Sequence, residues 1–198
     1  HSDFEPRSYS IANAPTNSNL IELHIRLVDD GKLTNFIFNT LTVKTILRIE
    51  GPKGSFFHRE DSECPIIFIA GGTGFGPVKA IIEHLINIGS TRVVYLYWGV
   101  RSEVDLYSNL PSEWSEKYPN ISFVPVLSEA SESWNGNKGY VHDSVVKDFE
   151  DLIDFEVYAC GPPVMVNAAV KSCLEHQLVK ENFFSDSFEY ANVSNDDA

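Results

Sequence analysis

The chain has 198 residues, 43% of them hydrophobic, and it carries a formal net charge of −13 at pH 7. This length can bury one substantial core or two smaller ones. The negative charge excludes a nucleic acid or an anionic membrane as a partner of the whole surface, because both require an excess of Lys and Arg. A local basic pocket for a phosphate is still compatible with it.

The cysteines and histidines show no metal-binding pattern. Cys64, Cys160 and Cys173 have neither zinc nor iron–sulfur spacing, and no two of the six histidines stand at helical i, i+4 spacing. We therefore expect no metal site in these residues and a reducing, cytoplasmic compartment. We recognise neither a signal peptide nor an apolar run of transmembrane length.

Residues 1–61 have the pattern of a small antiparallel barrel. Residues 8–12 suit a short strand, and residues 20–28 alternate strictly between apolar and polar, which predicts a half-buried antiparallel strand. The turn at residues 29–31 leads into a short helix around residues 33–41, and residues 44–57 return as a strand with a Gly-Pro turn.

From residue 62 the pattern changes. The run "PIIFIA" is continuously apolar, as expected of a strand buried on both faces of a parallel sheet. Strands then alternate with helices at least four times up to residue 198. This alternation predicts an α/β domain with a parallel, five-stranded, doubly wound sheet.

A cluster of glycines marks the first turn of this domain. Gly71, Gly72, Gly74 and Gly76 stand where the apolar strand ends and a helix begins. The unpaired N–H groups there favour a phosphate. Because Pro77 stands where the dinucleotide fingerprint has Gly or Ala, the turn alone leaves open whether the ligand is a nicotinamide nucleotide or another phosphate.

Four stretches together point to a family. They occur in the order "RSYS" (7–10), "GPKGSFF" (51–57), "GGTGFGP" (71–77) and "YACGPP" (158–163). In this order they resemble the ferredoxin–NADP reductase superfamily. The segments "IEGPKGSFF", "LYWGVRSEVDLY" and "FFSDSFEY" are most similar to the reductases that act with CDP-6-deoxy-4-hexulose-3-dehydrase, with free flavin reductases and oxygenase reductases as near neighbours.

The resemblance implies a flavin site in residues 1–61. Arg7 would bind the flavin phosphate, Tyr9 would stack on the isoalloxazine, and Ser10 would hydrogen-bond flavin N5. The next flavin-contacting strand would supply His24, Ile25 and Arg26; an ordinary solvated strand face is the alternative. A second set of phosphate donors would be Gly31, Lys32, Leu33 and Thr34, for which a plain turn and helix N-cap is the alternative.

It also implies a nicotinamide site at the glycine turn. The residues expected to hold the nucleotide are Gly72, Thr73, Gly74, Pro77, Gly161 and Pro162. Cys160 would lie beside the nicotinamide and the flavin; a buried structural thiol is the alternative. Phe188, with Tyr190 in reserve, would cover the flavin until nicotinamide displaces it, and aromatic core packing competes with this role.

The choice of nicotinamide cofactor depends on nearby charges. Ser128 is followed by Glu129, with Glu132 close by, and these acids would repel the 2′-phosphate of NADPH. Arg101 would attract it. We therefore expect NADH, with NADPH as the alternative. Asp105 is expected either to contact the cofactor or to cap the following helix.

These features predict a flavin-dependent NAD(P)H oxidoreductase. NADH would pass hydride to a flavin, FAD with FMN as the alternative, and electrons would then go to an iron–sulfur centre or a partner protein. A reductase of free flavin and a non-catalytic nucleotide-binding module are the alternatives. The [2Fe-2S] ligands that the resembling reductases carry are not in these residues, and residue 1 is His rather than Met. We therefore expect an upstream segment or a partner chain to complete the barrel and supply the cluster.

Overall fold

The computed structural model describes residues 4–15 and 19–187, and its centre is a six-stranded sheet in the order β4-β3-β2-β1-β5-β6. All pairings are parallel. The strands are β1 (Ile66–Gly71), β2 (Val94–Val100), β3 (Ile121–Leu127), β4 (Asn137–Lys138), β5 (Glu156–Gly161) and β6 (Phe183–Ser187). The predicted parallel, doubly wound sheet is confirmed, with the two-residue β4 as a sixth strand at one edge.

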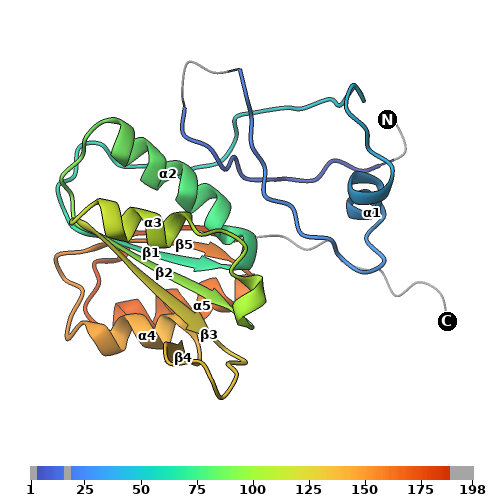
Figure 1. Ribbon diagram of the computed structural model, residues 1–198. Coiled ribbons are helices and arrows are strands. Elements are labelled where there is room, and N and C mark those ends of the chain that lie inside the picture. Colours follow the sequence, from blue (N-terminus) through green and yellow to red (C-terminus); the bar gives the residue numbers. More distant parts are fainter. Residues whose placement is uncertain (1–3, 16–18, 188–198) are drawn as a thin grey trace.

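Helices cover both faces of the sheet (Figure 1). They are α2 (Phe75–Asn87) and α3 (Leu110–Lys117) on one face, and α4 (Val141–Asp148) and α5 (Pro163–Glu175) on the other. Short 3-10 turns lie at Gly72–Gly74, Glu103–Asp105 and Lys180–Asn182.

The apolar run in β1 supplies both layers of the core. Phe68 and Ala70 belong to the cluster formed with α2 and α3, whereas Ile67 and Ile69 belong to the cluster formed with α4 and α5. Successive strand residues point to opposite faces, so a strand covered on both sides must be apolar throughout. All six residues of β1 are buried, as the sequence predicted.

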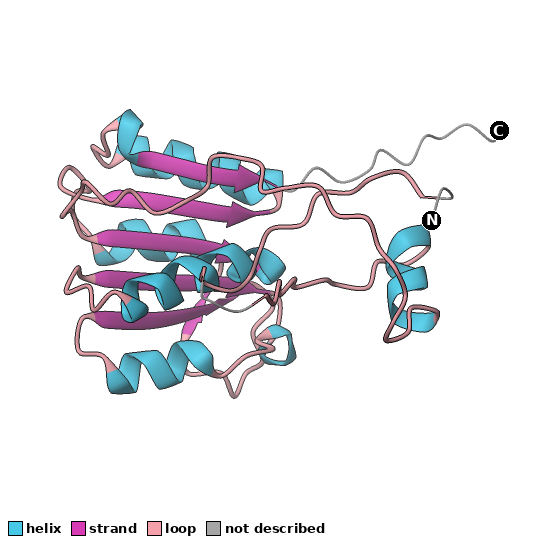
Figure 2. Cartoon of the chain, turned by 90° about the horizontal axis from the view of Figure 1, so that it is seen from above, coloured by secondary structure: helices cyan, strands magenta, loops and turns pink. Residues whose placement is uncertain are grey.

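The described residues before position 61 follow a different pattern. Apart from α1 (Lys32–Asn39), they form loops and one antiparallel bridge, between Ile11 and Leu23. The strands predicted at residues 8–12, 20–28 and 44–57 are therefore wrong as secondary structure, because the described chain offers these segments no continuous partner ladder. The helix prediction is confirmed. Figure 2 shows this part extending past the carboxyl ends of the parallel strands.

Apolar side chains in this part of the molecule are unusually exposed. Val43 is 93% exposed, Ile46 is 89% exposed and Ile49 is 66% exposed.

No helix of the described residues is long and apolar enough to cross a membrane.

A buried ion pair ties the linker before β1 to the sheet. Nη2 of Arg92 lies 2.8 Å from Oε2 of Glu156, and the two side chains are only 4% and 5% exposed. The guanidinium also donates to the carbonyl oxygens of Cys64 and Arg59 and to Nε2 of His58. All five of its N–H groups therefore have an acceptor, which a buried Arg requires.

Candidate functional site

The glycine turn lies at the carboxyl end of β1 and leads into α2. Gly72 has a φ of +53°, and a Cβ built there would meet nothing within 4 Å. A ligand can therefore approach this backbone closely. In an open parallel sheet this edge is where nucleotides bind, with the pyrophosphate at the helix N-terminus.

Gly74 holds the turn against the neighbouring strand. A Cβ at Gly74 would overlap the carbonyl oxygen of Cys160 and would lie 2.6 Å from its carbonyl carbon and 3.0 Å from the Gly161 nitrogen. Only glycine allows this contact between the two backbones. The structure thus brings together the turn and the end of β5 at Cys160 and Gly161, called the Cys160 loop below, which the sequence assigned to the same site.

An aromatic cluster around Trp98 packs against the turn. No role was assigned to this cluster from the sequence. Nε1 of Trp98 donates a 2.9 Å hydrogen bond to the carbonyl oxygen of Gly72. Phe75, the first residue of α2, stacks on Trp98 with ring centroids 4.3 Å apart. Tyr107 packs edge-on against the same indole at 5.1 Å. Trp98 thereby fixes the conformation of a turn that glycines alone would leave loose.

Ser10, Cys160 and Asp186 meet at the same edge of the sheet. Cys160 and Asp186 are paired positions of the adjacent strands β5 and β6. The Ser10 hydroxyl donates a 2.7 Å hydrogen bond to Oδ2 of Asp186. Burial, and secondarily the Asp186 charge, raise the pKa of the Cys160 thiol, so it stays protonated at neutral pH. Asp186 is a site residue that the sequence reasoning missed, although it lies within the "FFSDSFEY" segment.

Arg7 and His24, which the sequence predicted to contact flavin, have protein partners here. Arg7 bonds Oε2 of Glu5, and burial raises the pKa of Tyr9, which is half-buried. The two ring nitrogens of His24 lie 2.8 Å from the Tyr107 hydroxyl and 2.8 Å from Oε1 of Glu22. His24 thus contacts the nucleotide-binding portion through its side chain, and its predicted flavin contact stays a prediction.

The start of α1 has the predicted position. The helix begins at Lys32 with Gly31 as N-cap. The Thr34 hydroxyl donates to the Gly31 carbonyl at 3.1 Å and accepts from the Val28 amide at 3.2 Å. Ile25 and Leu33 are half-buried beside this turn. A helix start and a phosphate-binding set are both compatible with these contacts.

The charges expected to select the nicotinamide cofactor lie at the ends of β2 and β3. Nε of Arg101 lies 4.0 Å from Oε1 of Glu129, and the side chains are 72% and 71% exposed. Asp105 forms a capping box with Ser102 and lies 3.9 Å from Arg26. Since Asn109, and not Asp105, occupies the N-cap position of α3, the helix-cap alternative for Asp105 is wrong.

Two predicted residues lie outside the described part of the chain. Phe188 and Tyr190, expected at the flavin face, follow Ser187, the last described residue. Thr73 lies in the glycine turn, Pro77 in the first turn of α2 and Pro162 between β5 and α5. Their contact with the nucleotide stays a prediction.

Two histidines that are far apart in the sequence, His58 and His84, come together near Arg92, which precedes β2. Donor atoms of His58, Glu60 and His84 lie within 4.8 Å of one another. Arg92, however, donates to Nε2 of His58 at 3.0 Å. A cation bound there would displace that bond or force two donors together. The geometry therefore disfavours a metal at this cluster.

Replacing Gly74 with alanine tests the contact between the turn and the Cys160 loop. We expect NADH binding to the full-length protein to weaken roughly tenfold to a hundredfold, because overpacking of this kind costs about 1–3 kcal/mol. Gly76→Ala is the matched control, because its Cβ would meet side-chain atoms no closer than 3.4 Å. Isothermal titration with NADH separates them, and equal affinities for the two variants would contradict the assignment.

Comparisons with known proteins agree with this geometry. The family model described as "Oxidoreductase NAD-binding domain" matches residues 68–171. The model described as "Oxidoreductase FAD-binding domain" matches residues 3–58. The flavin-binding portion and the nucleotide-binding portion predicted from the sequence therefore each match the corresponding kind of domain.

Individual relatives span both parts. The chain is 50% identical over 182 residues to the CDP-6-deoxy-L-threo-D-glycero-4-hexulose-3-dehydrase reductase of Yersinia pestis. The matched region covers 92% of this chain and 55% of that protein. It is 35% identical over 187 residues to a probable flavin reductase of Aliivibrio fischeri, covering 92% of this chain and 79% of that protein. The crystal structure of the Amycolatopsis cytochrome P450 reductase GcoB matches with 34% identity and a TM-score of 0.83, over 92% of this chain and 56% of that one.

The chain spans about half the length of the first relatives that it matches, 56% and 55%. Its sheet topology, the meeting of the glycine turn with the Cys160 loop, and the two family matches agree with one another. The chain belongs to the ferredoxin–NADP reductase superfamily of FAD- and NAD-binding oxidoreductases.

Proposed function

We propose that this chain is the NADH-binding portion, together with part of the FAD-binding portion, of a flavin-dependent reductase. The observation that carries the proposal is the hydrogen bond between Ser10 and Asp186, 2.7 Å long. It joins the segment matched as FAD-binding to the carboxyl edge of the nucleotide-binding sheet, beside Cys160. A flavin ring and a nicotinamide held on these two sides would meet there.

The residues present fit the two cofactors. The open backbone at Gly72 and the first turn of α2 would hold the nucleotide pyrophosphate. FAD, when bound, accepts hydride from NADH and releases electrons singly. Ser10, whose O–H is donated to Asp186, would present its oxygen to the flavin ring as a hydrogen-bond acceptor. The buried, protonated Cys160 thiol would pack beside the nicotinamide without carrying charge.

Catalysis in this proposal rests mainly on positioning. Holding the two rings in contact converts an encounter of two reactants into a step within one complex. The burial of Cys160 and Trp98, both 0% exposed, gives the site a rigid, dry floor. Glu129, near Arg101 at the end of the neighbouring strands, would favour the ribose diol of NADH over the 2′-phosphate of NADPH.

The exposure of the apolar residues Val43, Ile46 and Ile49 favours the interpretation that the flavin barrel is incomplete in these residues. We propose that further barrel strands, from the same protein or a partner, cover them and complete the FAD site. The electrons would then pass to an iron–sulfur centre, because the Yersinia relative is named as the reductase of a dehydrase and another, from Acinetobacter baylyi, as a dioxygenase electron transfer component. We also propose a cytoplasmic location, since the three cysteines are free thiols, as in a reducing compartment.

Purification of the full-length protein tests the function. We expect a yellow protein whose bound flavin is bleached by NADH without oxygen, and more slowly by NADPH. The Aliivibrio relative favours one other candidate, a reductase of free flavin. That candidate predicts colourless protein whose NADH oxidation requires added flavin. Bound flavin that NADH fails to bleach would contradict both and leave a nucleotide-binding module.

A further inference from the structure

Lys79, on α2, is a charged residue buried where charge is expensive, and no role has been assigned to it so far. The residue is 5% exposed. Its ammonium lies 2.8 Å from the Ala12 carbonyl oxygen, 3.1 Å from Oε2 of Glu22 and 2.8 Å from Oε1 of Glu83. A lysine ammonium has three donors, and each of these has an acceptor. Burial of a charge is tolerated only with such partners.

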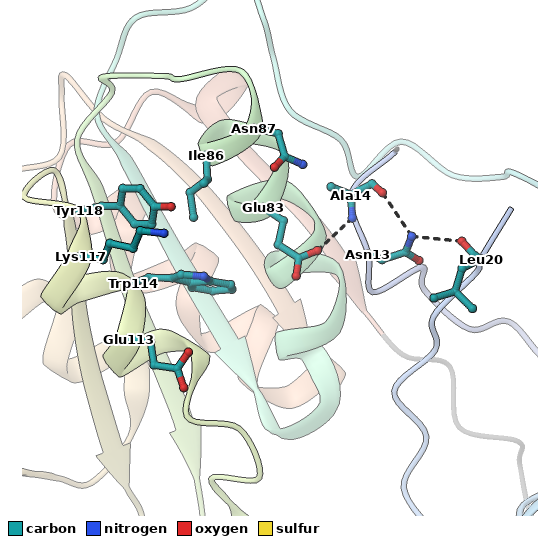
Figure 3. Close-up of a pocket in the computed structure, with 10 residues that line it drawn as sticks. All are labelled: Asn13, Ala14, Leu20, Glu83, Ile86, Asn87, Glu113, Trp114, Lys117 and Tyr118. Carbon is teal, nitrogen blue, oxygen red and sulfur yellow. Dashed lines mark hydrogen bonds between the residues drawn. The ribbon is translucent and has the colours of Figure 1, made fainter. Parts of the chain in front are cut away.

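The partners come from both portions of the molecule. Glu83 lies on α2, one turn after Lys79, and its other oxygen, Oε2, accepts a 3.1 Å hydrogen bond from the Ala14 amide (Figure 3). Ala12 and Glu22 belong to the flavin-side segments, which are joined by a 2.8 Å bond from the Ala12 amide to the Glu22 carbonyl oxygen. We call Ala12, Ala14, Glu22, Lys79 and Glu83 the Lys79 clamp.

Within the clamp, the Glu22 carboxylate is stabilised in its ionised form. Burial opposes ionisation of Glu22, but hydrogen bonds from His24 and Lys79 outweigh it and hold the pKa of Glu22 below its ordinary value. The ion pairs of Lys79 with Glu22 and Glu83 form a compact network between helix and segment.

The surroundings of the clamp make it a main contact between the two portions on this side. A cleft of about 440 Å³ lies between Asn13 and Leu20 on one side and Trp114 of α3 on the other. Figure 3 shows Glu83 beside this cleft, with its carboxylate directed to Ala14. Beside this cleft, Lys79 and Glu83 join α2 to the flavin-side segment.

The clamp is connected to the candidate site through α2 and through the segment that contains Ala12. α2 begins at Phe75, directly after the glycine turn that would hold NADH. Ala12 follows Ser10 by two residues, and Ser10 reaches Asp186 at the sheet edge. A shift of the segment along α2 would therefore move the flavin side relative to the nicotinamide side.

We propose that Lys79 is a positioning residue that sets the distance between flavin and nicotinamide. This inference rests on the proposed function. Lys79 does not touch the reacting atoms, because all three of its donors are directed to Ala12, Glu22 and Glu83. Its effect is exerted through the placement of Ser10.

The test compares K79M and K79R with the wild type in the full-length, flavin-loaded protein. Lys171→Met is the control, since it removes an exposed lysine of α5 whose nearest acid, Glu175, is 4.0 Å away. We expect K79M to slow flavin bleaching at saturating NADH roughly tenfold to a hundredfold, the cost of misplacing reactants by about 1 Å. The NADH–flavin charge-transfer absorbance should weaken, NADH affinity should persist, and K79R should recover part of the rate.

Three outcomes would overturn the assignment. K79M could keep both the rate and the charge-transfer band. It could lose flavin and NADH affinity in parallel with the rate, which would mark a general structural role. If the wild type itself fails to bleach, the proposed function fails. Amide hydrogen exchange of residues 10–14 then tests whether Lys79 holds this segment in place. Faster exchange in K79M than in K171M supports it, and equal exchange rejects it.

Discussion

Replacing Ser10 with alanine should slow the bleaching of bound flavin by NADH roughly a hundredfold, as loss of one preorganised hydrogen-bonding dipole does in other enzymes. Because the Ser10 O–H is donated to Asp186, the group that the flavin would lose is an acceptor for the N–H of the reduced ring. The hydroxyl is held by Asp186 at 2.7 Å, so its orientation is set before the cofactors bind. NADH affinity should change little, since the glycine turn and not Ser10 would hold the nucleotide. Anaerobic rapid mixing over a range of NADH concentrations separates the two quantities.

Two further variants sharpen this experiment. Asp186→Asn retains an acceptor for the Ser10 hydroxyl and should cost less than Ser10→Ala. Ser115→Ala, on α3, removes a hydroxyl that donates to the Ser112 carbonyl oxygen at 2.9 Å, and should leave the rate unchanged. A Ser10→Ala protein that loses rate and NADH affinity equally would contradict the role assigned to Ser10.

Replacing Arg92 with methionine should have the largest effect on stability. The change would leave the Glu156 carboxylate buried, 5% exposed, with only the Tyr158 hydroxyl as a neutral donor at 3.1 Å. Removing one partner of a buried ion pair costs about 3–5 kcal/mol. The carbonyl oxygens of Cys64 and Arg59 would also lose their donor.

Urea unfolding of the full-length protein, followed by tryptophan fluorescence, measures this loss. The fully buried Trp98 makes the signal sensitive to this domain. The double variant Arg92→Met/Glu156→Gln is the control and should recover part of the lost stability, because no uncompensated charge remains. If the single and double variants unfold at the same urea concentration, the cost does not come from the stranded carboxylate.

The sequence predicted the nucleotide-binding portion well, because its signals are local. A continuous apolar run can be buried on both faces only in a covered parallel sheet, and Ile66–Gly71 forms the predicted strand. The glycine turn was placed correctly for the same reason: strand, glycines and helix are adjacent in the chain. Gly74 and Cys160 could be assigned to one site because the carboxyl ends of parallel strands share an edge.

The flavin-side portion could not be predicted in the same way. Alternation in residues 20–28 indicates which side chains would face a core, but not whether a neighbouring strand is present to form a ladder. Asp186 lies between two serines on the last described strand, where no periodicity distinguishes it. Its contact with Ser10 spans 176 residues and depends on which strand lies next to β5.

Lys79 illustrates the same limit. In the sequence it reads as an ordinary lysine of an amphipathic helix, spaced i, i+4 from Glu83. Only the contacts of Ala12, Ala14 and Glu22 with α2 turn this surface pattern into a buried network.

The most direct test of the account is a single turnover of the full-length, FAD-loaded protein with NADH under anaerobic conditions. The nicotinamide C4 hydrogen that is transferred should be deuterated in a parallel sample. We predict that bound flavin is bleached within one turnover and that deuterium slows the bleaching, because hydride would pass directly between rings held at the Ser10, Cys160 and Gly74 edge. Bound flavin that NADH leaves oxidised, with no effect of the label, would contradict the account.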